Sequence, residues 1–320
     1  MRLLEIKDLK VYYFVRDGVI KAIDGIRLWM DKGESLGVVG ESGSGKSTLA
    51  AAIMRLIPPP GKIVEGSILF KGVDLTKLKE EDMRKIRGKS ISMVFQDPMT
   101  SLDPLQTIGD HLTETILAHE KIDRRKAIEM ALELLDKVGI PKDRFKDYPH
   151  QFSGGMRQRV MIALAMALKP DLIIADEPTT ALDVIIQAQI LDLLRELKDE
   201  LNMSLILISH DLSVVSEIAD RIAVMYAGHV MEFSDAMPLF DDPLHPYTQG
   251  LMRSVPNIEL SDQELRFIPG NPPDMLNPPS GCRFHPRCPR AMEICRIKEP
   301  PLVEVEKGRF VKCFLYGNDA

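Results

Sequence analysis

The order of apolar and polar residues predicts strands on either side of a long helical stretch. Residues 3–11 and 20–29 alternate apolar and polar side chains, as half-exposed strands do, and the run at 36–39 is typical of a buried strand. From residue 102 to about 169 the apolar residues recur at helical spacing. We therefore expect an antiparallel edge sheet, a buried sheet and an inserted helical region. Further strands are expected at 66–72, 91–95, 172–177 and 204–208, and helices at 47–56, from near 153–155 to 168, and at 184–201.

The composition narrows the possible partners and compartments. A chain of 320 residues has room for about two domains, and its net charge of −6 argues against a nucleic-acid partner. The longest apolar-rich run, 160–168, is too short to cross a bilayer, and the charged start of the chain lacks the apolar core of a signal peptide. We expect a cytoplasmic protein that can dock on a membrane protein.

A change in composition predicts a domain boundary near residue 235. Residues 1–235 carry the strand and helix patterns, whereas residues 236–320 are rich in proline and irregular. A linker-like C-terminal extension is expected there.

The segment Gly40–Ser47, GESGSGKS, fits the phosphate-binding loop pattern G-x-x-x-x-G-K-[ST]. It follows an expected buried strand and precedes an expected helix, which is the context that the pattern requires. Its glycines allow backbone N–H groups to surround a polyphosphate, Lys46 would reach the β- and γ-phosphates, and the Ser47 hydroxyl would ligate Mg²⁺. The alternative is a Gly/Ser-rich turn that holds no ligand.

Polar residues at the ends of later strands extend the predicted nucleotide site. Asp176 and Glu177 end an apolar strand, as expected of a magnesium ligand and a general base that acts on water. Gln96 follows the strand at 91–95 and could reach the metal or the attacking water. His210 follows the strand at 204–208, at the edge where a doubly wound sheet binds its ligands. In isolation, an acidic pair at a strand end and a lone histidine are often only structural.

A second glycine-rich helix start lies at Ser153-Gly154-Gly155. Its bare N–H groups could bind an anion, and Ser153 would cap the helix with or without a ligand.

The four cysteines are confined to the last part of the chain, at Cys282, Cys288, Cys295 and Cys313. Their clustering indicates a metal site, because disulfides are rare in a cytosolic setting. The short C-x₂₋₄-C spacing of zinc sites is absent, and proline follows Cys288 as in some ferredoxin sites, so a [4Fe–4S] cluster is favoured over Zn²⁺. A Cys₃His zinc site with His285 and four free thiols remain alternatives.

Six segments in order give the chain a resemblance to the nucleotide-binding subunits of ATP-binding cassette (ABC) transporters. They are GESGSGKS, VFQDP, FSGGMRQRV, LIIADEP, TALD and ISHD, within residues 1–235. Phe152 and Met156 depart from the commonest signature but resemble the oligopeptide and dipeptide permease branch, as do the segment His245-Pro246-Tyr247 and the cysteine spacing. His245 is interpreted here only as a mark of that branch.

The resemblance implies an α/β P-loop NTPase core with an antiparallel β subdomain, a helical subdomain at about 102–169 and a small irregular C-terminal extension. It implies that Tyr13 stacks on adenine, that Gln96 senses the membrane subunits, and that His210 contacts the γ-phosphate. Asp183 would lie in a segment that crosses the dimer interface, and Ser153, Gly154 and Gly155 would grip the γ-phosphate of ATP held by a partner chain. The expected ATP-contacting set is Tyr13, Gly40, Ser42, Gly43, Ser44, Gly45, Lys46, Ser47, Thr48, Gln96, Asp176, Ser153, Gly154 and Gly155, with Ser47, Gln96 and Asp176 on Mg²⁺.

The function implied by the resemblance is ATP hydrolysis that drives peptide import. The expected partners are a second ABC ATPase (a copy or a paralogue), two integral membrane permease subunits and, indirectly, an extracellular solute-binding protein. The subunit is expected at the cytoplasmic face of the membrane. Alternatives are an importer ATPase for nickel or another small solute, and a soluble ABC switch ATPase that works without a permease.

Overall fold

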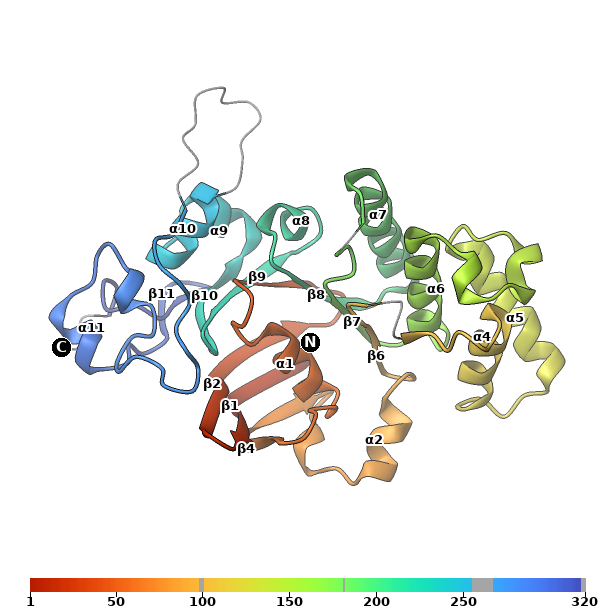
Figure 1. The fold of residues 1–320 in the computed structure, drawn as a ribbon, viewed down its shortest axis with the longest axis horizontal. Helices are drawn as coiled ribbons and strands as arrows, with labels where there is room; N and C mark the ends of the chain where they lie inside the picture. The colour runs from red at the N-terminus through yellow and green to blue at the C-terminus, as the bar shows by residue number, and fades with distance from the viewer. Residues whose placement is uncertain (98–100, 181, 255–266, 318–320) are drawn as a thin grey trace. The chain divides into compact units, whose positions relative to one another are not determined.

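The computed structural model describes residues 1–97, 101–180, 182–254 and 267–317, and this part of the chain divides into two compact units (Figure 1). The first unit comprises Met1–Lys77 and Ile208–Ala320, and the second comprises Leu78–Leu207. Pro98 and Ala181, which belong to two of the family segments, lie outside the described residues.

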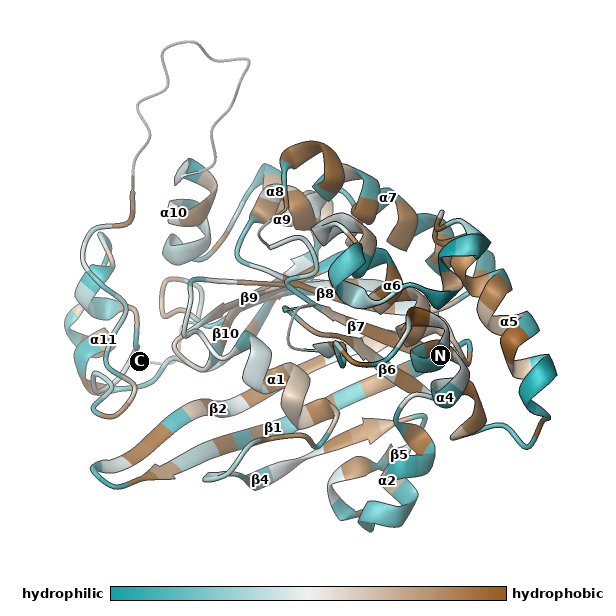
Figure 2. Cartoon of the chain, turned by 45° about the vertical axis from the view of Figure 1, so that its right-hand side comes forward, coloured by the Kyte–Doolittle hydropathy of each residue, from teal (hydrophilic) through white to brown (hydrophobic). Residues whose placement is uncertain are grey.

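The expected antiparallel edge sheet is present in the first unit. Strands β1 (Arg2–Val15) and β2 (Gly18–Asp31) pair antiparallel, and β4 (Gly61–Phe70) and β5 (Val73–Asp74) complete the order β2-β1-β4-β5 (Figure 2). Strand β4 begins five residues earlier than expected, because Gly61 pairs with Tyr13 of β1.

The first unit also contains strands of the buried sheet. Strand β3 (Ser35–Val39) is buried at all five positions and runs parallel to β9 (Arg221–Tyr226), which pairs antiparallel with β10 (His229–Asp235). Helices α1 (Lys46–Ile53) and α8 (Leu212–Ser216) belong to the same unit. Helix α1 ends three residues before the expected limit, because Arg55 has a left-handed φ of 50° that stops the helical turn.

The Pro-rich C-terminal region is more tightly attached than a linker. Strand β12 (Arg309–Val311) pairs antiparallel with β10 and with β11 (Val303–Glu306), so this region extends the sheet of the first unit. Its other elements are α9 (Ala236–Asp241), α10 (Pro246–Ser254), a 3₁₀ turn at His285–Arg287 and α11 (Glu293–Ile297). The linker-like expectation is wrong because strand pairing and buried side chains fix the segment.

The second unit contains the expected helical insertion. Helices α4 (Ile108–Leu117), α5 (Arg124–Lys137) and α6 (Gly154–Met166) pack together, after the short α2 (Glu80–Ile86). Helix α5 buries Ala127, Ala131 and Leu135, one residue per turn, and apolar and polar residues alternate along it (Figure 2).

Two parallel strands of the second unit lead to polar residues. Strands β6 (Ile91–Val94) and β7 (Leu172–Asp176) pair parallel, and helix α7 (Val184–Leu201) follows β7 with the bounds expected from the sequence. Strand β8 (Ser204–Ser209) begins in the second unit and ends in the first. No helix within the described ranges combines the length and hydropathy that crossing a membrane requires.

Candidate functional site

The glycine-rich loop before α1 has a backbone that only glycine fits. Gly40 has a φ of 156°, and a Cβ there would lie 2.1 Å from the Met225 carbonyl oxygen. Gly45 has a φ of 103°, and its Cβ would lie 2.5 Å from the Ala22 carbonyl oxygen. The loop is therefore held close against β9 and β2, as a preformed phosphate cradle needs.

Lys46 lies inside this loop rather than in solvent. Its side-chain ammonium donates to the carbonyl oxygens of Gly40 at 2.7 Å and Glu41 at 3.1 Å, and the residue is 5% exposed. The Ser44 hydroxyl is also buried and has no hydrogen-bond partner among the described residues. A buried orphan hydroxyl next to a buried ammonium fits a site for an anionic ligand. Ser47 is exposed and Thr48 partly exposed at the start of α1, while Ser42 and Gly43 lie exposed on the loop.

The second unit brings Gln96 and Glu177 together. The Gln96 amide donates to the Glu177 carboxylate at 3.1 Å, because the two residues follow the parallel strands β6 and β7. The Thr180 hydroxyl donates to the same oxygen at 2.9 Å, a contact that the sequence reading missed. Asp176 ends β7 and is 4% exposed.

Glu177 has an unusual backbone for a side chain of its size. Its φ is 47°, in the left-handed region that residues with a Cβ rarely adopt. Such strain costs of the order of 1–3 kcal/mol and is found most often where a side chain must be aimed. The bend and the two hydrogen bonds hold the carboxylate in one orientation.

Ser153 begins α6 as the N-cap, as expected. Its hydroxyl accepts from the Met156 N–H at 3.3 Å, and no acidic side chain lies in the first turn. A Cβ on Gly155 would lie 2.6 Å from the Ile186 side chain, so this helix start packs against α7. Phe152 is buried under the Arg144 guanidinium, 4.9 Å from the ring centre, which explains how the chain accommodates an aromatic residue there.

His210 and Tyr13 belong to the first unit. His210 is exposed and joins the end of β8 to Asp211, the N-cap of α8. Tyr13 is partly exposed on β1, and its ring lies where a Cβ on Gly61 would be, at 2.6 Å. Their contacts with a nucleotide stay predictions.

The four cysteines line one pocket in the first unit. All are free thiols, and His245, Phe284 and Met292 line the same pocket. Burial, aided by the other thiols nearby, raises the pKa of Cys282 to about 12 and that of Cys313 to about 11. Within the described ranges, however, no three His, Cys, Asp or Glu side chains are placed to hold a metal ion. The expected metal site therefore stays a prediction.

His245, interpreted from the sequence only as a mark of the family branch, also has a structural role. It is fully buried, its Nδ1 accepts from the Tyr247 N–H at 3.0 Å, and burial lowers its pKa to about 3. The Glu232 carboxylate accepts from the N–H groups of Leu244 and His245, both at 2.8 Å. These bonds fix a neutral imidazole at the wall of the cysteine pocket.

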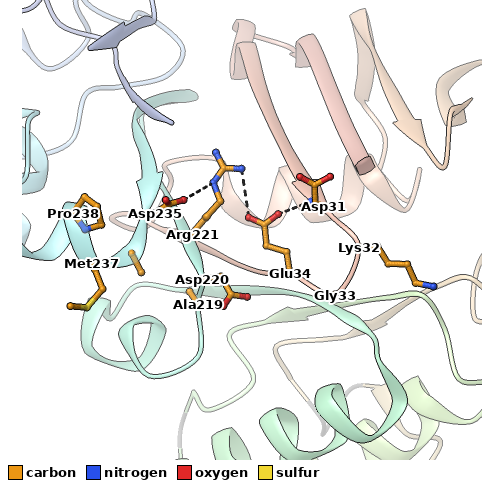
Figure 3. Close-up of a pocket in the computed structure, with 11 residues that line it drawn as sticks. Asp31, Lys32, Gly33, Glu34, Ala219, Asp220, Arg221, Asp235, Met237 and Pro238 are labelled. Atoms are coloured by element: carbon orange, nitrogen blue, oxygen red, sulfur yellow. Dashed lines mark hydrogen bonds and ion pairs between the residues drawn. The ribbon is translucent and has the colours of Figure 1, made fainter. Parts of the chain in front are cut away.

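A larger pocket of about 830 Å³ lies at the other end of β3 from Gly40 (Figure 3). Asp31, Glu34, Asp220 and Asp235 line it, and Arg221 lies 3.6 Å from Glu34 and 3.4 Å from Asp235. Burial raises the pKa of Glu34. An acidic lining makes this pocket unsuitable for a polyphosphate.

Comparison with known proteins identifies the family. The ABC transporter family matches residues 23–180, and the family described as "Oligopeptide/dipeptide transporter, C-terminal region" matches residues 231–295. The oligopeptide transport ATP-binding protein OppD of Bacillus subtilis is 52% identical, over 100% of this chain and 90% of that protein. OppD of Escherichia coli is 49% identical over 98% of this chain and 93% of its own, and the dipeptide transport protein DppD of B. subtilis is 48% identical over 98% and 95%.

Solved structures agree with this result. A dimeric post-hydrolysis state of the ATP-binding cassette MJ0796 with ADP and Pi matches with a TM-score of 0.66 and 30% identity, over 73% of this chain and 99% of that one. The ABC transporter component cbiO1 of Clostridium perfringens matches with a TM-score of 0.66 and 27% identity, over 75% and 91%. The predicted P-loop ATPase fold is confirmed.

Proposed function

Because this chain belongs to the oligopeptide and dipeptide branch of ABC transporter ATP-binding subunits, we propose that it is the ATP-hydrolysing motor of a peptide importer. The observation that carries the proposal is a sequence identity of about one half, over nearly the full length, with proteins named for oligopeptide and dipeptide transport. The glycine-rich loop, with its buried Lys46 and orphan Ser44 hydroxyl, supports ATP as the ligand.

In this proposal the chain's own groups divide the work of hydrolysis. The N–H groups of the loop Gly40–Ser47 other than that of Glu41, together with the Lys46 ammonium, hold the β- and γ-phosphates, and Tyr13 stacks on the adenine. Ser47, Asp176 and Gln96 would hold Mg²⁺, and that ion would neutralise charge on the phosphates. Glu177 accepts a proton from the attacking water, and His210 donates to the γ-phosphate.

A complete site in this proposal needs a second ATPase subunit, either a copy or a paralogue. Ser153 is exposed, and Gly154 and Gly155 are partly exposed, so their N–H groups are available to the γ-phosphate of a partner's ATP. Val184 is 82% exposed and Ile185 72% exposed, directly after Asp183. Two exposed aliphatic side chains at a helix start are suited to burial against another subunit.

Two permease subunits would bind the second unit. A groove of about 390 Å³ is lined by residues of β6, α4 and α6, and Phe95 beside them is 41% exposed. A groove with an exposed aromatic residue, next to Gln96, suits a helix from a membrane subunit. The ATPase would then work at the cytoplasmic face of the membrane, with an extracellular receptor supplying peptide.

Transport by reconstituted complexes tests the proposal. The chain is expressed with the permease and ATPase genes adjacent to its own and placed in proteoliposomes with their solute-binding protein. We expect uptake of labelled di- or oligopeptide that needs MgATP and stops with Glu177→Gln. Uptake of nickel instead of peptide would favour the small-solute alternative, and failure to co-purify with any integral membrane subunit would favour the switch ATPase.

We also propose that the four cysteines hold a [4Fe–4S] cluster, with Zn²⁺ as the alternative. Their convergence on one pocket without a disulfide supports this, and a cubane spreads its four thiolates further apart than a single ion does. Because the pKa values of Cys282 and Cys313 are raised, cluster binding must release protons and should weaken as the pH falls. Anaerobic purification should give brown protein with about four irons per chain. Stoichiometric zinc without iron would overturn the assignment. Where the cysteines are replaced by serine to test their role, the matched control is Ser280→Ala at an exposed site.

A further inference from the structure

Two buried arginines lie between the first two cysteines. Arg283 and Arg287 both belong to the segment Cys282–Cys288, and their side chains are 5% and 6% exposed. Buried arginines need charged partners, because an isolated charge is costly to remove from water. In both cases the partner lies near the glycine-rich loop of the same unit.

Arg287 binds the loop itself. Its guanidinium donates to both carboxylate oxygens of Glu41, at 2.6 and 3.0 Å, and its Nε donates to the Pro269 carbonyl at 2.9 Å. The Tyr226 hydroxyl accepts a weaker bond at 3.3 Å. A bidentate pair of this kind fixes direction as well as distance.

The position of Glu41 gives the ion pair with Arg287 a bearing on ligand binding. It is the second residue of GESGSGKS, so the loop that would bind a polyphosphate carries a carboxylate. A negative charge beside the phosphates opposes their binding unless a cation neutralises it. Arg287 supplies that cation and fixes the carboxylate by two hydrogen bonds.

Arg283 reaches the same loop by a second route. It donates to the Ala227 carbonyl and to Asp24, and Asp24 also accepts from the Tyr12 hydroxyl at 2.6 Å. The next residue in the turn, Gly228, donates its N–H to the Ser44 carbonyl at 2.9 Å. Arg283 thus holds the turn that supports the loop.

Tyr247 links this arrangement to the cysteine pocket. Its hydroxyl accepts from the Glu41 N–H at 2.9 Å, and its ring lies 5.3 Å from that of Phe284, a residue of the pocket. The cysteine pocket and the glycine-rich loop therefore share one layer of buried contacts.

We propose that Arg287 and Arg283 are positioning residues for nucleotide binding, through which the cysteine region sets the affinity of the glycine-rich loop for ATP. Arg287 does so by neutralising Glu41, and Arg283 by fixing the Ala227–Gly228 turn. The inference rests on the proposed function, because it takes ATP as the ligand of the loop.

The test is a charge-repair series on the full chain, with a fluorescent ATP analogue as the probe. Arg287→Met should weaken nucleotide binding by about tenfold or more, because Glu41 then faces the phosphates without a counter-charge. Glu41→Gln alone should bind the probe about as well as the unaltered chain. The double variant Glu41→Gln/Arg287→Met should recover to within about threefold. The matched control is Arg296→Met, since Arg296 is exposed in the same region.

The alternative is that the pair only stabilises the fold. In that case Glu41→Gln would weaken binding as much as Arg287→Met, and the double variant would recover nothing; either result overturns the inference. If Arg287→Met does not fold, Arg287→Lys keeps the charge but loses the bidentate geometry. It should bind the probe less tightly and show faster hydrogen exchange at residues 40–47, and unchanged values of both would contradict the proposal.

Failure of this inference is distinct from failure of the proposed function. If the unaltered chain does not bind the probe, ATP is not the ligand and the proposed function fails. If the unaltered chain binds it and Arg287→Met binds it equally well, only the positioning role is wrong. For Arg283, Arg283→Met should weaken binding without repair by Glu41→Gln, because its route runs through the turn.

Discussion

The two glycine-rich helix starts of this chain differ in how much of their surroundings the chain itself supplies. The loop Gly40–Ser47 is fixed by positive φ angles, by the buried Lys46 and by side chains from distant segments. The start of α6 at Ser153 has a single capping bond and stays partly open. The first is held by contacts from within the chain, whereas the second is capped by Ser153 and otherwise left partly exposed.

This difference matches the division of labour in the proposed dimer. A preorganised loop can hold ATP by itself, because the cost of ordering it was met on folding. An open helix start can only add to a nucleotide that another subunit brings. Four experiments, in descending order of the largest effect that each should produce, test whether the two segments differ in this way.

Glu177→Gln should separate binding from hydrolysis. Loss of the general base should slow phosphate release by about 10²–10⁴-fold, while the loop at Gly40–Ser47 still binds ATP. The uncleaved nucleotide should then hold two open helix starts in place and trap a dimer. Phosphate release and light scattering after gel filtration measure the two effects. Undiminished hydrolysis, or a monomer in saturating MgATP, would contradict the assignment.

Lys46→Ala should weaken ATP binding by the loop Gly40–Ser47 without affecting the helix start at Ser153. Removal of a charged hydrogen-bond donor should raise the dissociation constant for ATP by about 10–100-fold. Equilibrium titration with a labelled nucleotide measures it. Lys62→Ala, on β4, is the matched control. Equal affinity of Lys46→Ala and the unaltered chain would show that the loop does not bind phosphate through this side chain.

Paired Gly→Ala substitutions should distinguish the two backbones. Gly40→Ala places a Cβ 2.1 Å from a carbonyl oxygen and should destabilise the fold by about 1–3 kcal/mol. Among the described residues, the Cβ of Gly154→Ala meets only the Leu182 side chain at 3.4 Å, so stability should change by less than about 0.5 kcal/mol. Urea unfolding measures both. Equal losses would mean that both segments are equally constrained.

Ser153→Ala should cost about 1 kcal/mol through loss of the N-cap, at the lower end of the range expected for Gly40→Ala. Ser153→Asp keeps a capping oxygen and should restore the stability, but its charge should repel a partner's phosphate. Thermal unfolding and ATP-driven dimerisation would therefore respond in opposite ways. If Ser153→Asp dimerises normally with ATP, this helix start does not face phosphate.

The pattern of apolar and polar residues was sufficient to predict some helices and strands but not the limits of others. The apolar run of β3 and the helical spacing of α7 identify those elements, because their burial follows from neighbouring residues. The start of β4 at Gly61 depends on pairing with β1, and the end of α1 depends on the left-handed Arg55. Neither the pairing of two strands nor the φ angle of one residue produces a periodic pattern in the sequence.

The candidate site shows the same limit. The motifs place Lys46 where the glycine-rich loop meets α1, Glu177 directly after β7 and Ser153 at the start of α6, as the structure has them. They do not reveal that Thr180 binds Glu177 or that Arg287 binds Glu41, since these contacts depend on the folded backbone. The sequence does contain one indication of such contacts, namely two arginines within a seven-residue cysteine segment. Two guanidinium groups in a buried loop require acidic partners.

The 246 positions that separate Glu41 from Arg287 also set an order of events during synthesis. At about 5–20 residues per second, a ribosome needs roughly 12–50 s to add the arginine after the carboxylate. Through that interval the nascent chain carries its acidic loop without the counter-charge. If Arg287 sets the affinity of the loop as proposed, a nascent chain that does not yet contain it would bind ATP more weakly than one that does.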